Sequence, residues 1–162
     1  MNNEENKEIE YEQYISNHLH NVRLAFEKYK FKLCSALNIS INSLEENINR
    51  HDQSKYSDEE FDGYRQWFYP YDNEEKNKKQ FDDSWEHHYK NNPHHPEYWI
   101  RDDYIEDMPP IYIAEMLLDW ESMSMHFGND IRDYYRSERD KKPLSENTKK
   151  IIDSVIYNIF GD

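Results

Sequence analysis

The chain has 162 residues, in which 20 Lys and Arg stand against 34 Asp and Glu, so its formal charge is −14 at neutral pH. This length predicts a single domain over residues 1–162, and the negative charge excludes binding to duplex nucleic acid, because such a surface repels the phosphate backbone. Only three glycines occur, which excludes a glycine-rich phosphate loop and a dinucleotide fingerprint.

Apolar residues recur at helical spacing along almost the whole chain, which predicts an all-α fold, a bundle of about five to seven helices. A first helix is expected from Glu8 to Leu37, and a second after Ser43, where Ser43 and Glu46 have the spacing of a capping box. The first helix has one inward stripe, made of Tyr11, Ile15, His18, Val22, Phe26, Tyr29 and Leu33. The inner face of the second carries Leu44, Ile48 and His51.

The middle of the chain predicts two further helices. Ser57 and Glu60 repeat the capping pattern and predict a third helix that stops at Pro70. Residues 72–80 are charged and lack periodicity, so they are expected to form a loop. A fourth helix follows and must break at Pro93. Its inner face carries Phe81, Trp85, His88 and Asn92.

Two helices are expected in the last third of the chain. Pro109 and Pro110 start the fifth helix, and Gly128 is expected to end it. Its apolar stripe contains Ile113, Met116, Leu117, Trp120, Met123 and Phe127. Residues 136–142 mix basic and acidic side chains and predict a loop. The last helix, about residues 145–160, is expected only to pack on a core formed by about residues 8–130.

Seven of the eight histidines fall into three short clusters: His18 and His20, His51, and the group His87, His88, His94 and His95. Imidazole nitrogen and carboxylate oxygen are the usual donors to a borderline divalent cation when no thiolate is present. Because successive helical residues differ by about 100°, only one member of a neighbouring pair can face inward. His18 lies in the apolar stripe and His20 faces away from it. On the fourth helix His88 faces inward and His87 lies off that face.

Two carboxylates complete this set of donors. Asp52 stands beside His51 at the end of the second helix, and Asp119 borders the apolar stripe of the fifth. Taken singly, His18 has an alternative as a core histidine, Asp52 as a turn cap and Asp119 as an amphipathic-boundary residue. An inward carboxylate is costly unless it is paired or bound to metal. Four helices that each offer an inward polar donor therefore predict a shared metal site.

The order of these donors, H…HD…H…HH…D, resembles the HD-domain superfamily of metal-dependent phosphohydrolases, named for an adjacent His and Asp that are here His51 and Asp52. The segments HLHNV, HDQSKYSDEEF, SWEHHYKNNPHHPEYW and EMLLDW are also similar to an uncharacterised family of phages and bacteria. The similarity covers about residues 14–130, and the tail after about Arg136 resembles no family. It implies an all-α, HD-like domain that hydrolyses phosphate esters, with metal ligands that converge from several helices.

The same resemblance implies roles for individual residues. Two divalent cations, about 3.5–4 Å apart, would be bridged by Asp52 and would hold a hydroxide for attack on the phosphoryl group. One cation would bind His18, His51 and Asp119 and the other His88, His94 and His95, although the partner of each imidazole stays open. Mn, Fe, Zn, Ni and Co are not distinguished. Lys55 is expected to contact the substrate phosphate, with an exposed turn lysine as the alternative.

Further residues are expected around these ligands. Asn92, Glu97 and Glu115 have the chemistry to orient ligand imidazoles by hydrogen bonds, although a helix C-cap is the favoured interpretation of Asn92. Arg50 and Arg101 are weaker candidates to bind phosphate. Four aromatic residues flank the cluster and are expected to be mostly core, with stacking on a nucleobase as the alternative: Trp85, Tyr98, Trp99 and Trp120.

The leading hypothesis is thus a metal-dependent phosphohydrolase that acts on a nucleotide or another small phosphate ester. The alternatives are a mixed-valent di-iron oxygenase with an HD fold, and a non-catalytic, metal-stabilised interaction protein. No stretch approaches the roughly 18 apolar residues of a membrane span. The acidic start lacks the regions of a secretion signal, and a single cysteine, Cys34, excludes an internal disulfide. A cytoplasmic protein without a membrane partner is therefore expected.

Overall fold

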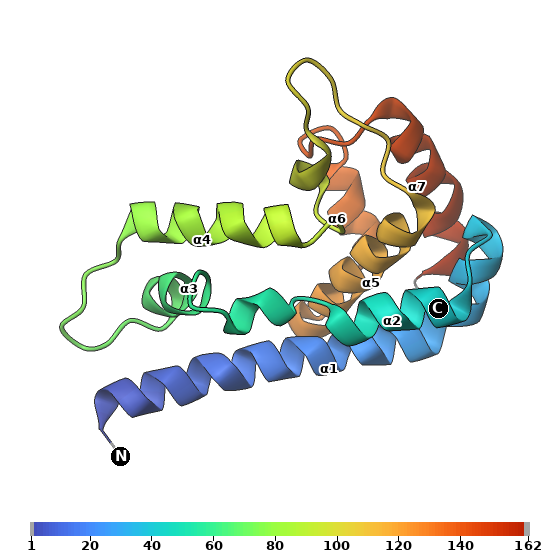
Figure 1. Cartoon of the computed structure of the whole chain (residues 1–162). Coiled ribbons are helices and arrows are strands. Elements are labelled where there is room, and N and C mark those ends of the chain that lie inside the picture. Colours follow the sequence, from blue (N-terminus) through green and yellow to red (C-terminus); the bar gives the residue numbers. More distant parts are fainter. Residues whose placement is uncertain (1, 161–162) are drawn as a thin grey trace.

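A computed structural model describes residues 2–160, and helices dominate it (Figure 1). The α-helices are α1 (Asn3–Leu37), α2 (Ile41–Arg50), α3 (Phe61–Phe68), α4 (Lys78–Asn91), α5 (Pro110–Phe127), α6 (Ile131–Glu138) and α7 (Glu146–Ile159). Two short 3-10 helices lie between them, η1 (Gln53–Tyr56) and η2 (Pro96–Trp99). Within the described residues, the only β pairing is an isolated bridge between Ile100 and Ile105. The predicted all-α fold is confirmed.

Side chains that cap the helices explain where the first two begin. α1 starts before the expected Glu8, because the Asn2 side chain accepts the backbone N–H of Glu5 and the Glu5 carboxylate accepts that of Asn2. The predicted cap at Ser43 is wrong. Ser40 caps α2 instead, and its Oγ accepts the N–H of Ser43.

Two later boundaries also differ from the prediction. α3 begins at Phe61, and Ser57 ends η1 rather than capping a helix with Glu60. The loop predicted over residues 136–142 is partly wrong, because α6 runs through Arg136. Only Ile131 and Tyr135 of α6 are buried, so a short helix with two apolar anchors is hidden within a charged run.

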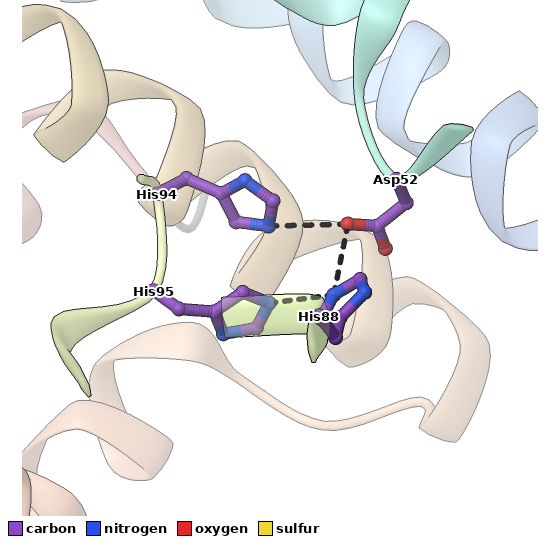
Figure 2. A group of neighbouring side chains, drawn as sticks. All are labelled: Asp52, His88, His94 and His95. Atoms are coloured by element: carbon purple, nitrogen blue, oxygen red, sulfur yellow. Dashed lines mark hydrogen bonds and ion pairs between the residues drawn. The ribbon is translucent and has the colours of Figure 1, made fainter. Parts of the chain in front are cut away.

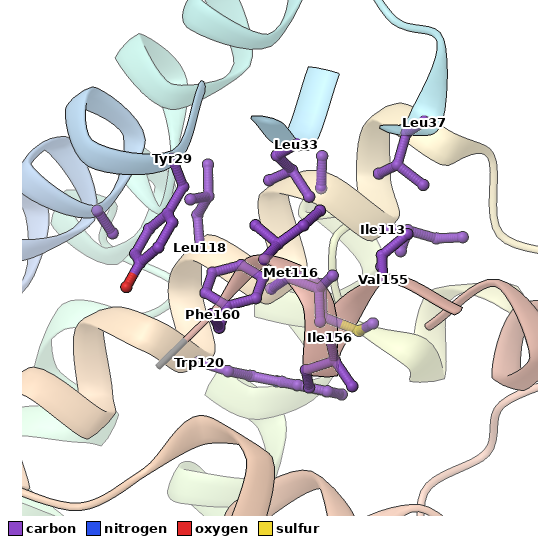
Figure 3. Close-up of a cluster of buried hydrophobic side chains, with 14 of the residues drawn as sticks. Tyr29, Leu33, Leu37, Ile113, Met116, Leu118, Trp120, Val155, Ile156 and Phe160 are labelled. Carbon is purple, nitrogen blue, oxygen red and sulfur yellow. The ribbon is translucent and has the colours of Figure 1, made fainter. Parts of the chain in front are cut away.

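The main apolar core lies between α1, α5 and α7 (Figure 3). Tyr29, Leu33 and Leu37 of α1 face Ile113 and Leu118 of α5, and α7 covers them (Figure 3). The α7 contribution is Ile152, Val155, Ile156 and Ile159. A smaller cluster of Tyr11, Ile15 and Tyr64 joins the first half of α1 to α3. His18 therefore occupies the gap along α1 between two apolar clusters.

No helix in residues 2–160 is both long enough and apolar enough to cross a lipid bilayer.

An ion pair fixes the loop after α3. The guanidinium of Arg65, a residue only 3% exposed, donates to both carboxylate oxygens of Glu74 over 2.6 and 2.8 Å. It also lies 3.8 Å from the ring centre of Tyr71, whose backbone N–H donates to the same carboxylate. The hydrogen bonds from Arg65 lower the pKa of Glu74 to about 2. This loop is thus held by a charge that persists at acid pH.

Replacing Glu74 by Gln should lower the free energy of unfolding by about 2 kcal/mol at neutral pH, because Arg65 loses its charged acceptor. The pKa of Glu74 is depressed in the folded state, so its contribution is complete above the ordinary value of 4.5 and is lost as the pH falls toward about 2. Urea unfolding at a series of pH values measures this. Glu75→Gln, at an exposed neighbouring position, is the control. A difference that stayed constant over that pH range would contradict the prediction.

Candidate metal centre

The structure brings all seven predicted metal ligands to one place. His18 comes from α1, His88 from the last turn of α4 and Asp119 from α5, while the others lie in the connections that follow α2 and α4. Six of the seven are buried, and His95 is half-buried: His18, His51, Asp52, His88, His94, His95 and Asp119. The exposed His20 and the half-buried His87 are the members of their pairs that the helical geometry excluded.

The backbone at the end of α2 places Asp52. Its φ of 54° lies in the left-handed region, which among the non-glycine residues described occurs elsewhere only at Asn38. Asp and Asn adopt this conformation more readily than most residues. The reversal lets the chain leave α2 at His51 and enter η1 at once. As a result, both side chains of the His-Asp pair face the centre.

The first set of donors surrounds one oxygen of Asp52. His18 Nε2 lies 3.3 Å from Asp52 Oδ2 and 3.1 Å from Asp119 Oδ1. His51 Nε2 lies 3.5 Å from the same Asp52 oxygen and 3.7 Å from Asp119 Oδ1. Two imidazoles and two carboxylates from α1, α5 and the end of α2 therefore point at a common position.

The second set surrounds the other oxygen of Asp52 (Figure 2). His88 Nε2 and His94 Nε2 each lie 3.3 Å from Asp52 Oδ1. His95 Nε2 is 3.0 Å from His88 Nε2, so it joins the same group. Asp52 is thus shared, with one oxygen facing each set of donors.

These separations fit a metal ion better than hydrogen bonds. The Nε2 atoms of His18, His51 and His94 and the Oδ1 atom of Asp52 are buried and have no hydrogen-bond partner. Buried polar atoms without a partner are rare and costly. Two ligands that each lie about 2.1 Å from one ion are themselves about 3.0 Å apart in octahedral and about 3.4 Å apart in tetrahedral geometry. Four of the separations, 3.1 to 3.3 Å from an imidazole Nε2 to an oxygen of Asp52 or Asp119, fall within this spacing, and the two that involve His51 are slightly longer at 3.5 and 3.7 Å.

A family model matches residues 7–158, nearly the whole chain. The chain belongs to DUF5662, a family of unknown function. No curated protein and no solved structure gives a match. Both sets of donors lie inside the matched part of this DUF5662 member.

An outer layer of carboxylates orients the imidazoles. Glu115 Oε1 lies 2.9 Å from His51 Nδ1 and 3.1 Å from His94 Nδ1. Glu60 Oε1 lies 2.5 Å from His88 Nδ1, and its other oxygen lies 2.7 Å from His87 Nδ1. An imidazole that donates from Nδ1 keeps its Nε2 lone pair free for a metal ion. Glu115 and the Nδ1 atoms of His51 and His94 also lie close enough together to suggest a third metal site. Because both nitrogen atoms contact Glu115, we assign this group to the outer layer instead.

Sequence reasoning anticipated Glu115 in this layer but missed Glu60. The capping pattern assigned Glu60 to a helix start, whereas its side chain is fully buried against His88. Asn92 has the second of its two expected roles and caps the end of α4. Its amide donates to the carbonyl of His88 and to Ser54 Oγ, each over 2.8 Å, and so ties the end of α4 to η1.

Three other candidates form no hydrogen bond with the predicted ligands in the described residues: Glu97, Arg101 and Arg50. The Oε2 of Glu97 is buried without a hydrogen-bond partner, and this residue lines the same cavity as His88 and His95. Arg101 pairs with Glu106, and Arg50 is exposed and contacts Asn47. The expectation that the flanking aromatics are mostly core is correct for Trp120, whereas three are only partly buried: Trp85, Tyr98 and Trp99.

The electrostatics of the centre are set by buried carboxylates. Burial alone would lower the pKa of His51, but Asp52 and the other acids outweigh it and raise the pKa to about 9. Burial opposes ionisation of Asp52, yet His51 and Lys55 hold its pKa well below the ordinary value. Burial and the neighbouring His94 and His88 keep the pKa of His95 well below its usual range. The buried carboxylates of the centre are therefore stabilised by positive charge, which protons on the histidines or bound metal cations can supply.

The centre opens into a cavity of about 420 Å³. Lys55 lines this cavity, and its Nζ lies 2.8 Å from Asp52 Oδ2. Aromatic side chains from several helices form much of the remaining wall. They include Tyr11, Tyr14, Tyr64, Phe68, Phe81, Trp85, Trp120 and Tyr134. A small ligand that enters here meets the donors, a cation and apolar rings together.

The shared position of Asp52 predicts about two divalent ions per chain, as in other carboxylate-bridged centres. After loading with Mn²⁺ or Zn²⁺ and removal of free metal, elemental analysis should find this ratio. Asp52→Asn should reduce the metal content to below about one ion per chain, because a neutral amide is a poor bridge between two cations. Asn tolerates the left-handed backbone at this position, so the fold should be retained. His20→Ala, two residues from His18, should retain the full content. Asp52→Asn with unchanged metal content would contradict the shared carboxylate.

Glu115→Gln should weaken metal binding by about 10- to 100-fold, because the hydrogen bonds that orient His51 and His94 lose their charged acceptor. Competition with a chromogenic chelator measures the change in affinity. Glu121→Gln on the same helix is the matched control, since Glu121 contacts Tyr29 rather than an imidazole. Equal affinities for the two variants would show that Glu115 does not support the ligands.

Proposed function

We propose that this member of DUF5662 is a metal-dependent phosphohydrolase that acts on a nucleotide or another small phosphate ester. The observation that carries the proposal is the surroundings of Asp52. Each of its oxygens faces a separate set of metal donors, and the Lys55 ammonium lies 2.8 Å from it at the cavity wall. Clustered cations at one position suit the charge that develops during phosphoryl transfer. The resemblance of the donor order to the HD-domain superfamily supports the same reaction.

The reaction joins a water oxygen to phosphorus and breaks the ester P–O bond, and the departing alcohol takes up a proton. Two divalent cations bound at the two donor sets would supply Lewis-acid stabilisation of the phosphoryl charge. Glu60 and Glu115 hold the imidazoles in the orientation that this binding needs. Aromatic side chains form much of the cavity wall, and apolar surroundings of this kind strengthen electrostatic interactions with a bound ester.

Lys55 is the residue placed to bind the phosphoryl group. Burial opposes its charge, but Asp52 outweighs that effect and raises the pKa of Lys55, so it is a cation at neutral pH. An ammonium has three donors, and the ion pair with Asp52 leaves others for a ligand in the cavity. Charge-assisted hydrogen bonds to phosphoryl oxygens are among the stronger polar contacts.

Metal-loaded protein should release phosphate from at least one member of a panel of nucleotides, cyclic dinucleotides and phosphate monoesters. Lys55→Met should lower kcat/KM by about 10²- to 10³-fold, because it removes charge stabilisation at the phosphoryl group, and should leave metal content unchanged. Lys90→Met, at an exposed position on α4, is the control. The proposal would be contradicted if no substrate released phosphate, or if the rate of release were the same without metal and in Lys55→Met. Oxygen uptake without phosphate release would instead support the oxygenase alternative.

A further inference from the structure

A second lysine lines the cavity away from the donor sets. Lys142, in the connection between α6 and α7, belongs to the same wall as Trp120 and Tyr134. Its Nζ lies 5.6 Å from the ring centre of each. Trp120 directly follows the donor Asp119 on α5, and both line the cavity. The wall is therefore continuous from the candidate metal centre to the Lys142 ammonium.

Lys142 forms no ion pair with any carboxylate in residues 2–160. Lys32, Lys76 and Lys150 also lack an ion pair within that range, but of these four lysines only Lys142 lines the cavity. Lys55 is paired with Asp52, and the neighbouring Lys141 is paired with Glu138. Aromatic faces stabilise an ammonium only in part. The charge of Lys142 is thus left available to an anion inside the cavity.

The position of Lys142 is fixed by its backbone. Its N–H donates to the carbonyl of Glu138 over 3.0 Å, and its carbonyl accepts the N–H of Leu144 over 2.8 Å. Pro143 follows directly and restricts Lys142 to an extended conformation. Leu144 is only 5% exposed and anchors the segment in the core. The backbone at Lys142 is thus held in place before any ligand arrives, which reduces the backbone entropy lost on binding.

Resting on the proposed phosphohydrolase function, we propose that Lys142 binds a second anionic group of the substrate. Trp120 and Tyr134, the rings beside Lys142 in this wall, suit a flat apolar portion of the ligand next to the second anionic group. The substrate class is then a small phosphate ester that carries a second carboxylate or phosphate. The cavity of about 420 Å³ lies within the usual range for small-molecule sites, about 300–1,000 Å³.

Non-hydrolysable phosphonates test this without turnover. The probes carry a second anionic group on the aromatic ring: 4-carboxyphenylphosphonate, 1,4-phenylenebisphosphonate, or the naphthalene analogue of the bisphosphonate. Calorimetry on the Mn²⁺-loaded protein should show that at least one of them binds at least about 10-fold more tightly than the aryl monophosphonate with the same ring. Comparison of the carboxyphenylphosphonate with the bisphosphonate shows whether the second anionic group is a carboxylate or a phosphate-like group. Lys142→Met should abolish the gain and leave the affinity for the monophosphonate unchanged. Lys142→Arg should keep most of the gain.

Lys141→Met is the matched control, since Lys141 is exposed and does not line the cavity. Methionine keeps an apolar stem against Trp120, so the melting temperature of Lys142→Met should equal that of the parent protein. Equal affinity of the parent for the single and double anions, or a gain that survives Lys142→Met, would overturn this inference and leave the phosphohydrolase proposal intact. Absence of metal-dependent binding for every phosphonate would overturn both.

Discussion

Four carboxylates buried around one point constrain the rest of this molecule: Asp52, Glu60, Glu115 and Asp119. Removing a carboxylate from water costs several kcal/mol unless positive charge or donors replace the solvent. Lys55 supplies one charge, and the imidazoles supply the rest as protonated groups or as ligands of metal cations. The helices must therefore converge here. A fold that separated the acids from the histidines would leave buried carboxylates without compensating charge or hydrogen-bond donors.

The long helix α1 reconciles this polar centre with an apolar core. Its inward stripe belongs to one hydrophobic cluster up to Ile15 and to the main cluster from Val22 onward, with His18 between them. Packing of α1 against α5 on either side of His18 sets its 3.1 Å separation from Asp119. Side chains in rigid, close-packed surroundings hold ligand geometry better than side chains on loops. The apolar clusters thus determine the geometry of the donor atoms as much as the donor residues themselves do.

Periodicity in the sequence predicted most helices and decided which histidine of each pair turns inward, because helical geometry is local. It did not predict the partner of Glu60, because His88 lies 28 residues away and the contact depends on how α3 packs against α4. The sequence also did not predict the left-handed backbone conformation of Asp52, because Asp permits that conformation without requiring it. Lys142 lay in a charged run where no pattern separates a cavity residue from a solvated one.

The charge of the whole chain and the charge of a metal-loaded cavity have opposite effects on an anionic ligand. A net charge of −14 repels such a ligand at distances comparable to the Debye length, about 8 Å at physiological ionic strength. Within the cavity, the ammonium groups of Lys55 and Lys142 face the carboxylates of Asp52, Asp119 and Glu97, so divalent cations at the donor sets would be needed to make its interior positive. Under the proposed function, recognition of a phosphate ester must therefore be short-ranged. A ligand with two anionic groups is repelled more strongly on approach, yet it also gains from two fixed cations once inside.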